Sequence, residues 1–235
     1  VKSQTYKYSI QQPQLDGNKI GVTDVNNLSA ADIQKIKDQI KIEHSKTSTD
    51  ARLASKKGEA LENSSTVVKD ISIANGTITV TYNDDSTDTA SISSIARTNV
   101  APTVEIPYSV DGKKDIYVYA NEDIDVDLKY NDDSGKIKSA TIKQGGNRAL
   151  SPVNSAEPNV INNEFDTTFT QIDGETATPA IVKITGKMTK ETPGLTASKF
   201  PTDESGEYRI VTRYATATDL DDAIIDNTAI GNSYA

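Results

Sequence analysis

Apolar residues recur at the spacing of one helix face in the first part of the chain. The stripe is made by Ile33, Ile36 and Ile40, with Lys and Gln on the other face. Ser29 is a favourable N-cap, and Asp32 three residues later completes the pattern of a capping box. The pattern predicts a helix that begins after Ser29 and ends near His44, before a run of Ser and Thr.

The period changes to two from residue 66 onward. Asn75-Gly76 is the strongest short hairpin signal, and it separates a strand before residue 75 from a strand over residues 77–82. Residues 87–92 predict a third strand, and residues 4–10 alternate like a short strand near the N-terminus. One helix beside a small antiparallel sheet predicts an α+β module of about ninety residues.

Every later segment has the pattern of a strand. The predicted strands cover residues 103–106, 115–120, 124–130, 137–143, 167–172, 180–188 and 208–217. Many strands at this spacing, separated by turn residues, predict an all-β sandwich. Residues 97–102 are short and polar and end in proline, so we expect two domains, 1–98 and 99–235. The fold class is therefore mainly β, with a small α+β module first.

Three long connections follow the strands of the second domain: residues 145–164, 189–206 and 218–233. Long loops on a β-sandwich commonly carry binding functions. The sequence Tyr-Asn-Asp-Asp-Ser occurs twice, at residues 82–86 and 130–134, and both copies predict the same hairpin turn.

Charge and composition exclude several classes of function. Lys and Arg number 25 against 34 Asp and Glu, which gives a net charge of −9. This charge argues against binding to nucleic acid and against docking to anionic membranes. No apolar run is long enough for a membrane span. The absence of Cys excludes disulfides, Cys-type zinc sites and thiol nucleophiles, and the absence of a Cys pair and of Trp excludes an antibody-type core.

His44 is the one histidine, and we expect it to be a solvated residue near the dipole of the helix end. The chain begins without a signal peptide, so we expect it to be a piece of a longer protein. Abundant Ser, Thr, Asn and Asp without Cys are typical of an extracellular bacterial protein, although a cytosolic protein can share this composition.

Three segments of the second domain carry a resemblance to a known family. They are Ala101-Pro102-Thr103-Val104-Glu105-Ile106-Pro107-Tyr108, Asp132-Asp133-Ser134-Gly135-Lys136-Ile137-Lys138-Ser139-Ala140, and Val211-Thr212-Arg213-Tyr214 followed by Ala215-Thr216-Ala217-Thr218-Asp219. In this order they resemble the Siglec-like module of the serine-rich repeat adhesins of oral streptococci. The first domain resembles the small "Unique" module that accompanies it.

The resemblance implies a V-set immunoglobulin-like β-sandwich that binds terminal sialic acid on host O-linked glycans. The ligand-binding residues that it implies, on strand F, are Val211, Thr212, Arg213 and Tyr214. Two features depart from the family. Val211 stands where the family commonly has Tyr, and the Unique-like module precedes the Siglec-like one instead of following it. Tandem modules in the parent protein would explain the reversed order.

The chemistry of the motif suits an acidic sugar. The guanidinium of Arg213 is a planar fork of donors that matches a carboxylate, and Thr212 adds a hydroxyl that can donate and accept. Because neighbouring strand residues point to opposite faces, both can touch one ligand only near a strand end or through backbone groups. The alternative is a surface arginine paired with a neighbouring acid. We expect Tyr214, with Ile210, to lie in the core.

Acidic clusters offer two further hypotheses. Asp219, Asp221 and Asp222 are candidates for a calcium site, since Ca²⁺ prefers oxygen ligands at close spacing, and solvated turns are the alternative. Paired carboxylates can hydrolyse glycosides, but no motif marks a catalytic pair. We therefore expect no enzyme, no resident metal and no other cofactor.

These observations together predict a non-enzymatic adhesin fragment at the bacterial cell surface, in the cell wall. We expect it to be a monomer that binds sialylated host glycoproteins carrying mucin-type O-glycans, without nucleic-acid partners or membrane insertion. Two alternatives remain open: a ligand-free stalk or spacer domain, and a protein–protein interaction module of a surface protein.

Overall fold

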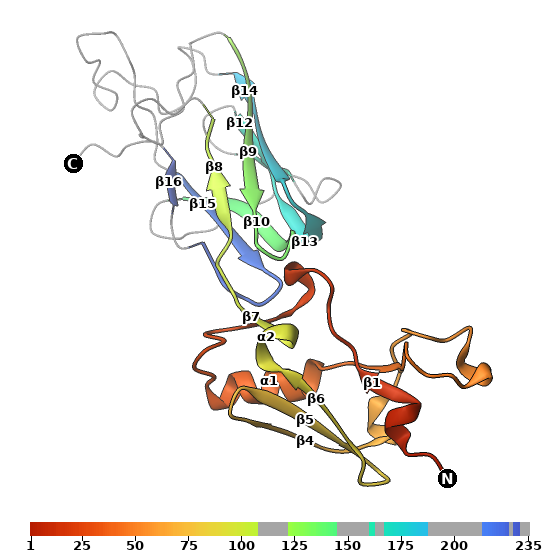
Figure 1. The fold of residues 1–235 in the computed structure, drawn as a ribbon. Coiled ribbons are helices and arrows are strands. Elements are labelled where there is room, and N and C mark those ends of the chain that lie inside the picture. Colours follow the sequence, from red (N-terminus) through yellow and green to blue (C-terminus); the bar gives the residue numbers. More distant parts are fainter. Residues whose placement is uncertain (108–121, 145–159, 163–166, 188–212, 226–227, 231–235) are drawn as a thin grey trace. The chain divides into compact units, whose positions relative to one another are not determined.

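The computed structural model of the 235-residue chain describes residues 1–107, 122–144, 160–162, 167–187, 213–225 and 228–230. The chain divides into two units, Val1–Asn99 and Val100–Ala235 (Figure 1). Their folding as independent domains remains a prediction. Within the described residues, no helix has the length and apolar character needed to cross a membrane.

Helix α1 of the first unit (Ala30–Gln39) begins as predicted. The Ser29 hydroxyl accepts a hydrogen bond from the Asp32 amide, and the Asp32 carboxylate accepts one from the Ser29 amide, which completes the capping box. Ile36 is fully buried, and Ile40 follows the helix in an extended conformation. The apolar stripe therefore anchors the helix to the core of this unit.

The predicted end of this helix, near His44, is wrong. The chain leaves the helix after Gln39 and forms strand β3 (Ile42–His44), which pairs antiparallel with β1 (Tyr8–Ile10). Burial of Ile42 and pairing with a distant segment outweigh continuation of the helix. His44 is partly buried in this strand, with its ring centroid 5.7 Å from that of Tyr8. It is not a solvated residue at a helix end.

A three-stranded antiparallel sheet provides the rest of the core of the first unit. Its strands are β4 (Val68–Ala74), β5 (Thr77–Tyr82) and β6 (Thr87–Ser91). The predicted hairpin at Asn75-Gly76 is confirmed: both residues have positive φ, 52° and 76°, as a type I′ turn requires. Ile78, Val80 and Tyr82 have no exposed surface and share a core cluster with Ile36.

Short elements complete the first unit. Strands β2 (Ile20–Val22) and β7 (Ala96–Thr98) pair in parallel, and α2 (Ile92–Ile95) lies just before β7. Single 3₁₀ turns are η1 (Gln4–Tyr6), η2 (Asp16–Asn18), η3 (Ala51–Leu53) and η4 (Ser64–Thr66). The strand predicted over residues 4–10 is therefore η1 followed by β1.

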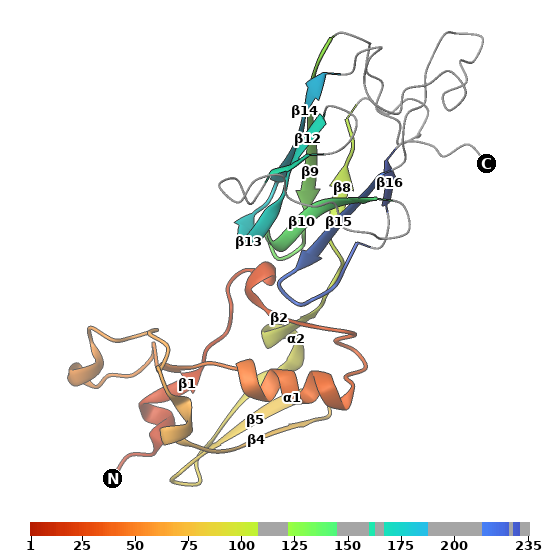
Figure 2. The ribbon, with the colours of Figure 1, turned by 180° about the vertical axis from the view of Figure 1, so that it is seen from behind.

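The second unit is a sandwich of two sheets (Figure 1, and from behind in Figure 2). One sheet has the order β11-β12-β14-β9-β8, and the other has the order β13-β10-β15-β16. The strands are β8 (Thr103–Glu105), β9 (Asp123–Asn131), β10 (Lys136–Gln144), β11 (Val160–Asn162), β12 (Thr167–Thr170), β13 (Ile172–Ala177), β14 (Ala180–Lys187), β15 (Arg213–Asp219) and β16 (Thr228–Ile230).

This strand order confirms the predicted V-set immunoglobulin-like sandwich. The orders β8-β9-β14-β12 and β10-β15-β16 correspond to the A-B-E-D and C-F-G sheets of that fold, so β15 is strand F. Strand β13 occupies the edge beside β10, where variable-type domains add strands, but in the chain it lies between β12 and β14 and does not directly follow β10. One core cluster takes residues from both sheets, including Leu128, Val182 and Ile142, because inward and outward residues alternate along each strand.

Some predicted boundaries in this unit need correction. The predicted strand 167–172 is two strands, β12 and β13, which belong to different sheets. The predicted loop 145–164 contains β11, and the predicted loop 218–233 contains the end of β15 and the whole of β16. Short strands such as β16 become visible only through their pairing partners. The predicted strand 115–120 lies outside the described residues.

The repeated Tyr-Asn-Asp-Asp-Ser sequence forms one shared side-chain contact but two different turns. In both copies the third residue, Asp84 or Asp132, accepts hydrogen bonds from the amide and hydroxyl of the serine two positions later. The first copy closes the β5–β6 hairpin, whereas the second connects strands of different sheets. The prediction of one hairpin turn used twice is therefore wrong. Both leading tyrosines, Tyr82 and Tyr130, are buried, and burial raises their pKa.

Candidate functional site

The described part of the Thr-Arg motif lies on strand β15. Arg213 is the first residue of this strand that the structure describes, Tyr214 follows it, and Val211 and Thr212 lie outside the described residues. Arg213 pairs with Gln144 on one neighbouring strand and with Ile230 on the other. The described residues of the motif therefore lie on an inner strand of the four-stranded sheet.

Several connections of the second unit attach at this same end of the sandwich (Figure 1). Gln144 is the last described residue of β10 and lies opposite Arg213, and the connection 145–164 follows it in the chain. Ile230 ends β16, and Lys187, which ends β14, pairs with Asp123 at the start of β9. Residues 145–159 and 188–212 lie outside the described residues. The structure thus describes their attachment points and not their course.

The two faces of β15 are opposite to the expectation. Ala215 and Ala217 are buried in the core cluster, whereas Tyr214 is only partly buried and lies outside it. Residues alternate between faces along a strand, so Tyr214 belongs to the outer face, together with Thr216 and Thr218. The hydroxyl of Thr216 contacts the carbonyl of Thr141 at 3.3 Å. The prediction that Tyr214 belongs to the core is wrong at this position.

Lys143 is a residue that the sequence pattern did not single out. It pairs with Tyr214 across β10 and β15, and its side chain is partly exposed. Directly opposed residues on adjacent strands lie close enough for their side chains to interact. The signal that identifies Lys143 is strand register, which a sequence without its pairing partners does not reveal.

Most lysines of this unit that the structure describes are paired with carboxylates. The distance from the lysine Nζ to the aspartate Oδ1 is 2.7 Å for Lys138 and Asp222, 2.6 Å for Lys183 and Asp125, and 3.3 Å for Lys187 and Asp123. Lys136 pairs with Glu175. Among the lysines described in this unit, Lys129 and Lys143 have no carboxylate of a described residue within ion-pair distance. Lys143 therefore adds a cation beside the motif on the neighbouring strand.

The second unit also carries the whole net charge of the chain. Its 13 Lys and Arg oppose 22 Asp and Glu, which gives −9, whereas the first unit has 12 of each sign. A unit of this charge repels anionic ligands at long range. Any anionic ligand must therefore be held by close, specific contacts with individual cations.

The candidate calcium ligands lie at the opposite end of β15. Asp219 is 1% exposed, and its Oδ1 accepts hydrogen bonds of 2.8 Å from the amides of Asp221 and Ala223. The carboxylate of Asp219 thus stabilises the turn after β15. The alternative to a calcium site was a turn with solvated carboxylates, and for Asp219 that alternative is wrong, because its side chain is buried. Asp222 pairs with Lys138. Within the described residues, no three His, Asp or Glu side chains gather closely enough to hold a metal ion.

Known proteins offer two structural matches to this chain and no curated relative. A search of curated proteins finds no match. A solved structure described as the sialic acid binding region of a Streptococcus sanguinis SK1 adhesin bound to 3'sLn matches with 21% identity and a TM-score of 0.42. That match covers 96% of this chain but only 46% of the S. sanguinis chain. A structure of Titin-A168169 matches with 10% identity and a TM-score of 0.31, and it covers 74% of this chain and 77% of the titin chain.

The family comparison covers more than half of the chain. The family described as the GspA/SrpA SigLec-like domain matches residues 103–229, which extend from β8 into β16. This match confirms the resemblance to the Siglec-like module of the streptococcal adhesins, and the family consists of adhesin domains. The chain belongs to the family of the GspA/SrpA SigLec-like domain.

Proposed function

We propose that this chain is a non-enzymatic fragment of a bacterial surface adhesin that binds terminal sialic acid on host O-linked glycans. The proposed contacts are made by Thr212 and Arg213, with Val211 and Tyr214 on either side. The observation that carries the proposal is the position of Arg213 on strand F, where it pairs with Gln144, the residue that precedes the connection 145–164. Membership of the Siglec-like family supports the same assignment.

The proposal places the ligand over the end of strand F, for a geometric reason. Consecutive residues in the middle of a strand point to opposite faces, so Thr212 and Arg213 could not both reach one sugar there. At a strand end this alternation stops, and both residues can face one ligand. A ligand that sits over the strand end can therefore accept the guanidinium fork on its carboxylate and the threonine hydroxyl on a neighbouring oxygen.

The charge of the second unit determines the character of the proposed binding. With a net charge of −9, the unit does not attract an anionic glycan from a distance. Binding then depends on a few charge-assisted hydrogen bonds with little apolar burial, and the affinity of one site is on the order of micromolar to millimolar. Several copies on one cell would raise the effective affinity through avidity.

Other parts of the chain have supporting roles in this proposal. The connections 145–164 and 189–206 select among sialylated glycans by contacting the sugars beyond the sialic acid. The connection 218–233 begins at the opposite end of β15, and its strand β16 returns to the motif at Ile230, so its last residues have the same role in this proposal. The first unit braces the second. The protein acts as a monomer at the bacterial cell wall, and its partners are sialylated glycoproteins with mucin-type O-glycans.

Replacement of Arg213 by Glu tests the proposed site. The substitution removes the donor fork and places a negative charge against the ligand carboxylate, so binding to sialylated glycans should be abolished. Loss of charge-assisted hydrogen bonds alone costs about 1.5–3 kcal/mol, which is a factor of about ten to one hundred. Lys129→Glu is a matched control, because it makes the same charge change at a residue of β9 on the other sheet.

Two alternatives predict different outcomes. A spacer domain gives no signal on an array of sialylated and neutral glycans. A protein-interaction module captures a protein partner whether or not the partner is desialylated. If Arg213→Glu binds sialylated glycans as well as the parent while both show the same melting curve, the proposed site is wrong.

A further inference from the structure

The first unit is neutral overall, but its charges are unevenly distributed. Residues 1–7 and 45–58 contain a single acidic residue, Asp50, and six basic residues: Lys2, Lys7, Lys46, Arg52, Lys56 and Lys57. These 21 residues therefore carry +5, while the other 214 residues carry −14, which together make the total of −9. We call the surface formed by these two segments the basic surface.

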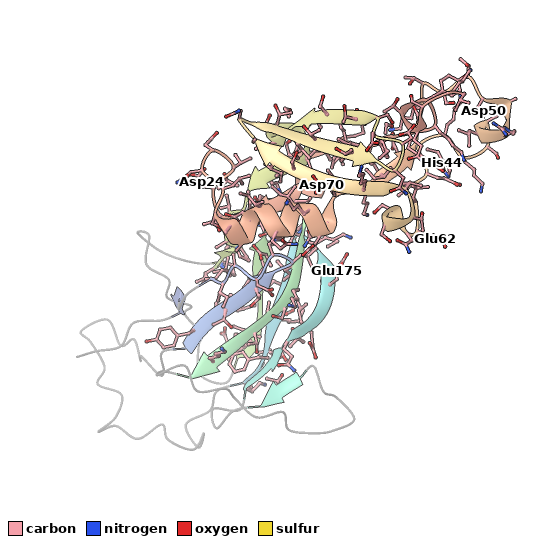
Figure 3. The ribbon with its side chains drawn as sticks, turned by 90° about the horizontal axis from the view of Figure 1, so that it is seen from below. Asp24, His44, Asp50, Glu62, Asp70 and Glu175 are labelled. Carbon is pink, nitrogen blue, oxygen red and sulfur yellow. The ribbon has the colours of Figure 1, made fainter. Side chains whose placement is uncertain are left out.

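Tertiary contacts bring the two segments together. The Tyr6 hydroxyl hydrogen-bonds the hydroxyl of Thr49, and the amide of Ser45 donates to the carbonyl of Lys7 at 2.9 Å. The ammonium of Lys2 lies 3.7 Å from the centroid of the Tyr6 ring. In Figure 3, Asp50 marks the outer end of the second segment and His44 its base, at the end of the unit away from Asp24. The six cations thus belong to one region of the first unit.

Backbone hydrogen bonds to His44 and two buried side chains hold the second segment, residues 45–58, in place. The His44 amide donates to the Glu59 carbonyl at 2.9 Å, and the Gly58 amide donates to the His44 carbonyl at 2.8 Å. Within the segment, Leu53 and Ser48 are buried, with 5% and 2% of their surface exposed. The basic surface is therefore built on an ordered scaffold, which lowers the entropy lost when a ligand binds.

Few carboxylates neutralise the basic surface. All six cations are exposed, and Arg52 forms a two-pronged pair with Asp50 at 2.9 Å and 2.6 Å. The Nζ of Lys46 lies 3.6 Å from Oε2 of the buried Glu43. The other four, Lys2, Lys7, Lys56 and Lys57, have no carboxylate within ion-pair distance among the described residues. An anionic ligand would relieve the repulsion between these like charges.

We propose that the basic surface binds an anionic polysaccharide, whose sulfate or carboxylate groups pair with these lysines. Exposed hydroxyls of Thr47 and Ser55 lie on the same segment and can hydrogen-bond sugar oxygens. A single-stranded nucleic acid fits less well, because it needs free aromatic rings on which bases stack. Here Lys2 covers the ring of Tyr6, and Tyr8 is only 9% exposed.

The surrounding charge limits the contact to a short run of sugars. The rest of the first unit carries −5 and repels a polyanion that extends beyond the basic surface. The basic surface would thus supply a local attraction to anionic glycans on a chain that is acidic as a whole. This site lies on a different unit from the proposed sialic acid site, and it does not depend on Arg213.

Binding of a heparin decasaccharide, which is sulfated and contains no sialic acid, tests the proposal on the full chain. We expect binding that weakens at least tenfold when the salt concentration rises from 50 to 300 mM, and no binding to a neutral dextran of equal length. Lys56→Glu combined with Lys57→Glu should weaken heparin binding at least tenfold. The control, Lys37→Glu with Lys41→Glu, makes the same change in net charge on and just after α1 and should change binding less than twofold.

Several results would overturn the proposal. Equal weakening by the control pair would mean that only net charge matters, and equal affinity for a single-stranded DNA of the same charge would remove the assignment to a polysaccharide. If the double Glu variant melts earlier than the parent, Lys56→Gln with Lys57→Gln should still weaken binding in the same direction. Arg213→Glu should leave heparin binding unchanged, so failure of the sialic acid site and failure of the basic surface are distinguishable.

Discussion

Lys143 of β10 and Tyr214 of β15 are paired directly across two adjacent strands, one residue from the pair formed by Gln144 and Arg213. Both side chains are partly exposed, and Lys143 has no ion-pair partner among the described residues. The first described residues of the proposed site thus have a cation beside them on the neighbouring strand. This arrangement connects the Thr-Arg motif to β10 as well as to β15.

Lys143→Glu should lower affinity for sialylated glycans about threefold to tenfold, because a charge at the rim of the site changes from attraction to repulsion. Isothermal titration or surface-based binding measures this change, and it should shrink at high salt. Lys129→Glu, on the other sheet, should bind like the parent. If Lys143→Glu leaves the affinity for sialylated glycans unchanged while Arg213→Glu abolishes binding, the ligand does not extend to β10.

Exchange of the three connections 145–164, 189–206 and 218–233 for those of a relative should change glycan preference without unfolding the protein. In the proposed site the motif contacts the sialic acid alone, and discrimination between glycans needs contacts with the next sugars. The third exchange must keep Asp219 and β16, because both belong to the framework of the sandwich. An unchanged preference on a glycan array after all three exchanges would remove this role.

The two units should behave as separate domains. Limited proteolysis is expected to cut within residues 99–102, and calorimetry should show two transitions. The reason is that each unit has a core cluster of its own, one including Ile36 and Ile78 and the other including Leu128 and Val182. A single cooperative transition with no cleavage in that segment would contradict this prediction.

The stability of the first unit should depend on pH through Asp32. The amide of Thr23 is the main cause that lowers the pKa of this buried carboxyl from 3.8 to about 2, and the hydroxyl and amide of Ser29 contribute as well. Because the folded-state pKa is depressed, the contribution is fully present above about pH 4 and is lost as the pH falls through 2. The contribution of the Asp32 carboxylate to the free energy of unfolding is about 2 kcal/mol.

Asp32→Asn should therefore destabilise the first unit at pH 7, and the difference from the parent should narrow between pH 4 and pH 2. Thermal unfolding at a series of pH values measures it. Asp38→Asn is the matched control, since Asp38 is exposed on the same helix and contacts only the side chain of Gln34 among the hydrogen bonds described. A constant difference across this range would mean that the Asp32 carboxylate is not the titrating group.

Local chemistry alone was enough to predict several features of this protein. The Asn75-Gly76 turn forms because both positions need positive φ, which these two residues tolerate well. Helix α1 starts at its capping box, since that contact needs only residues three positions apart. The strands of the sandwich follow the alternation along β9 and β14. The Thr-Arg motif is different, because the resemblance of three short segments to a known family, and not local chemistry, pointed to it.

Non-local contacts decided the rest, because they depend on which distant segments meet. Helix α1 ends early since Ile42 enters the core beside β1, and no residue near the helix end signals this pairing. The outward position of Tyr214 depends on which face of β15 meets the opposite sheet. The basic surface exists because folding brings residues 1–7 against residues 45–58. Composition reports only the sum of charges, −9, whereas the tertiary structure separates that sum into a basic region and an acidic remainder.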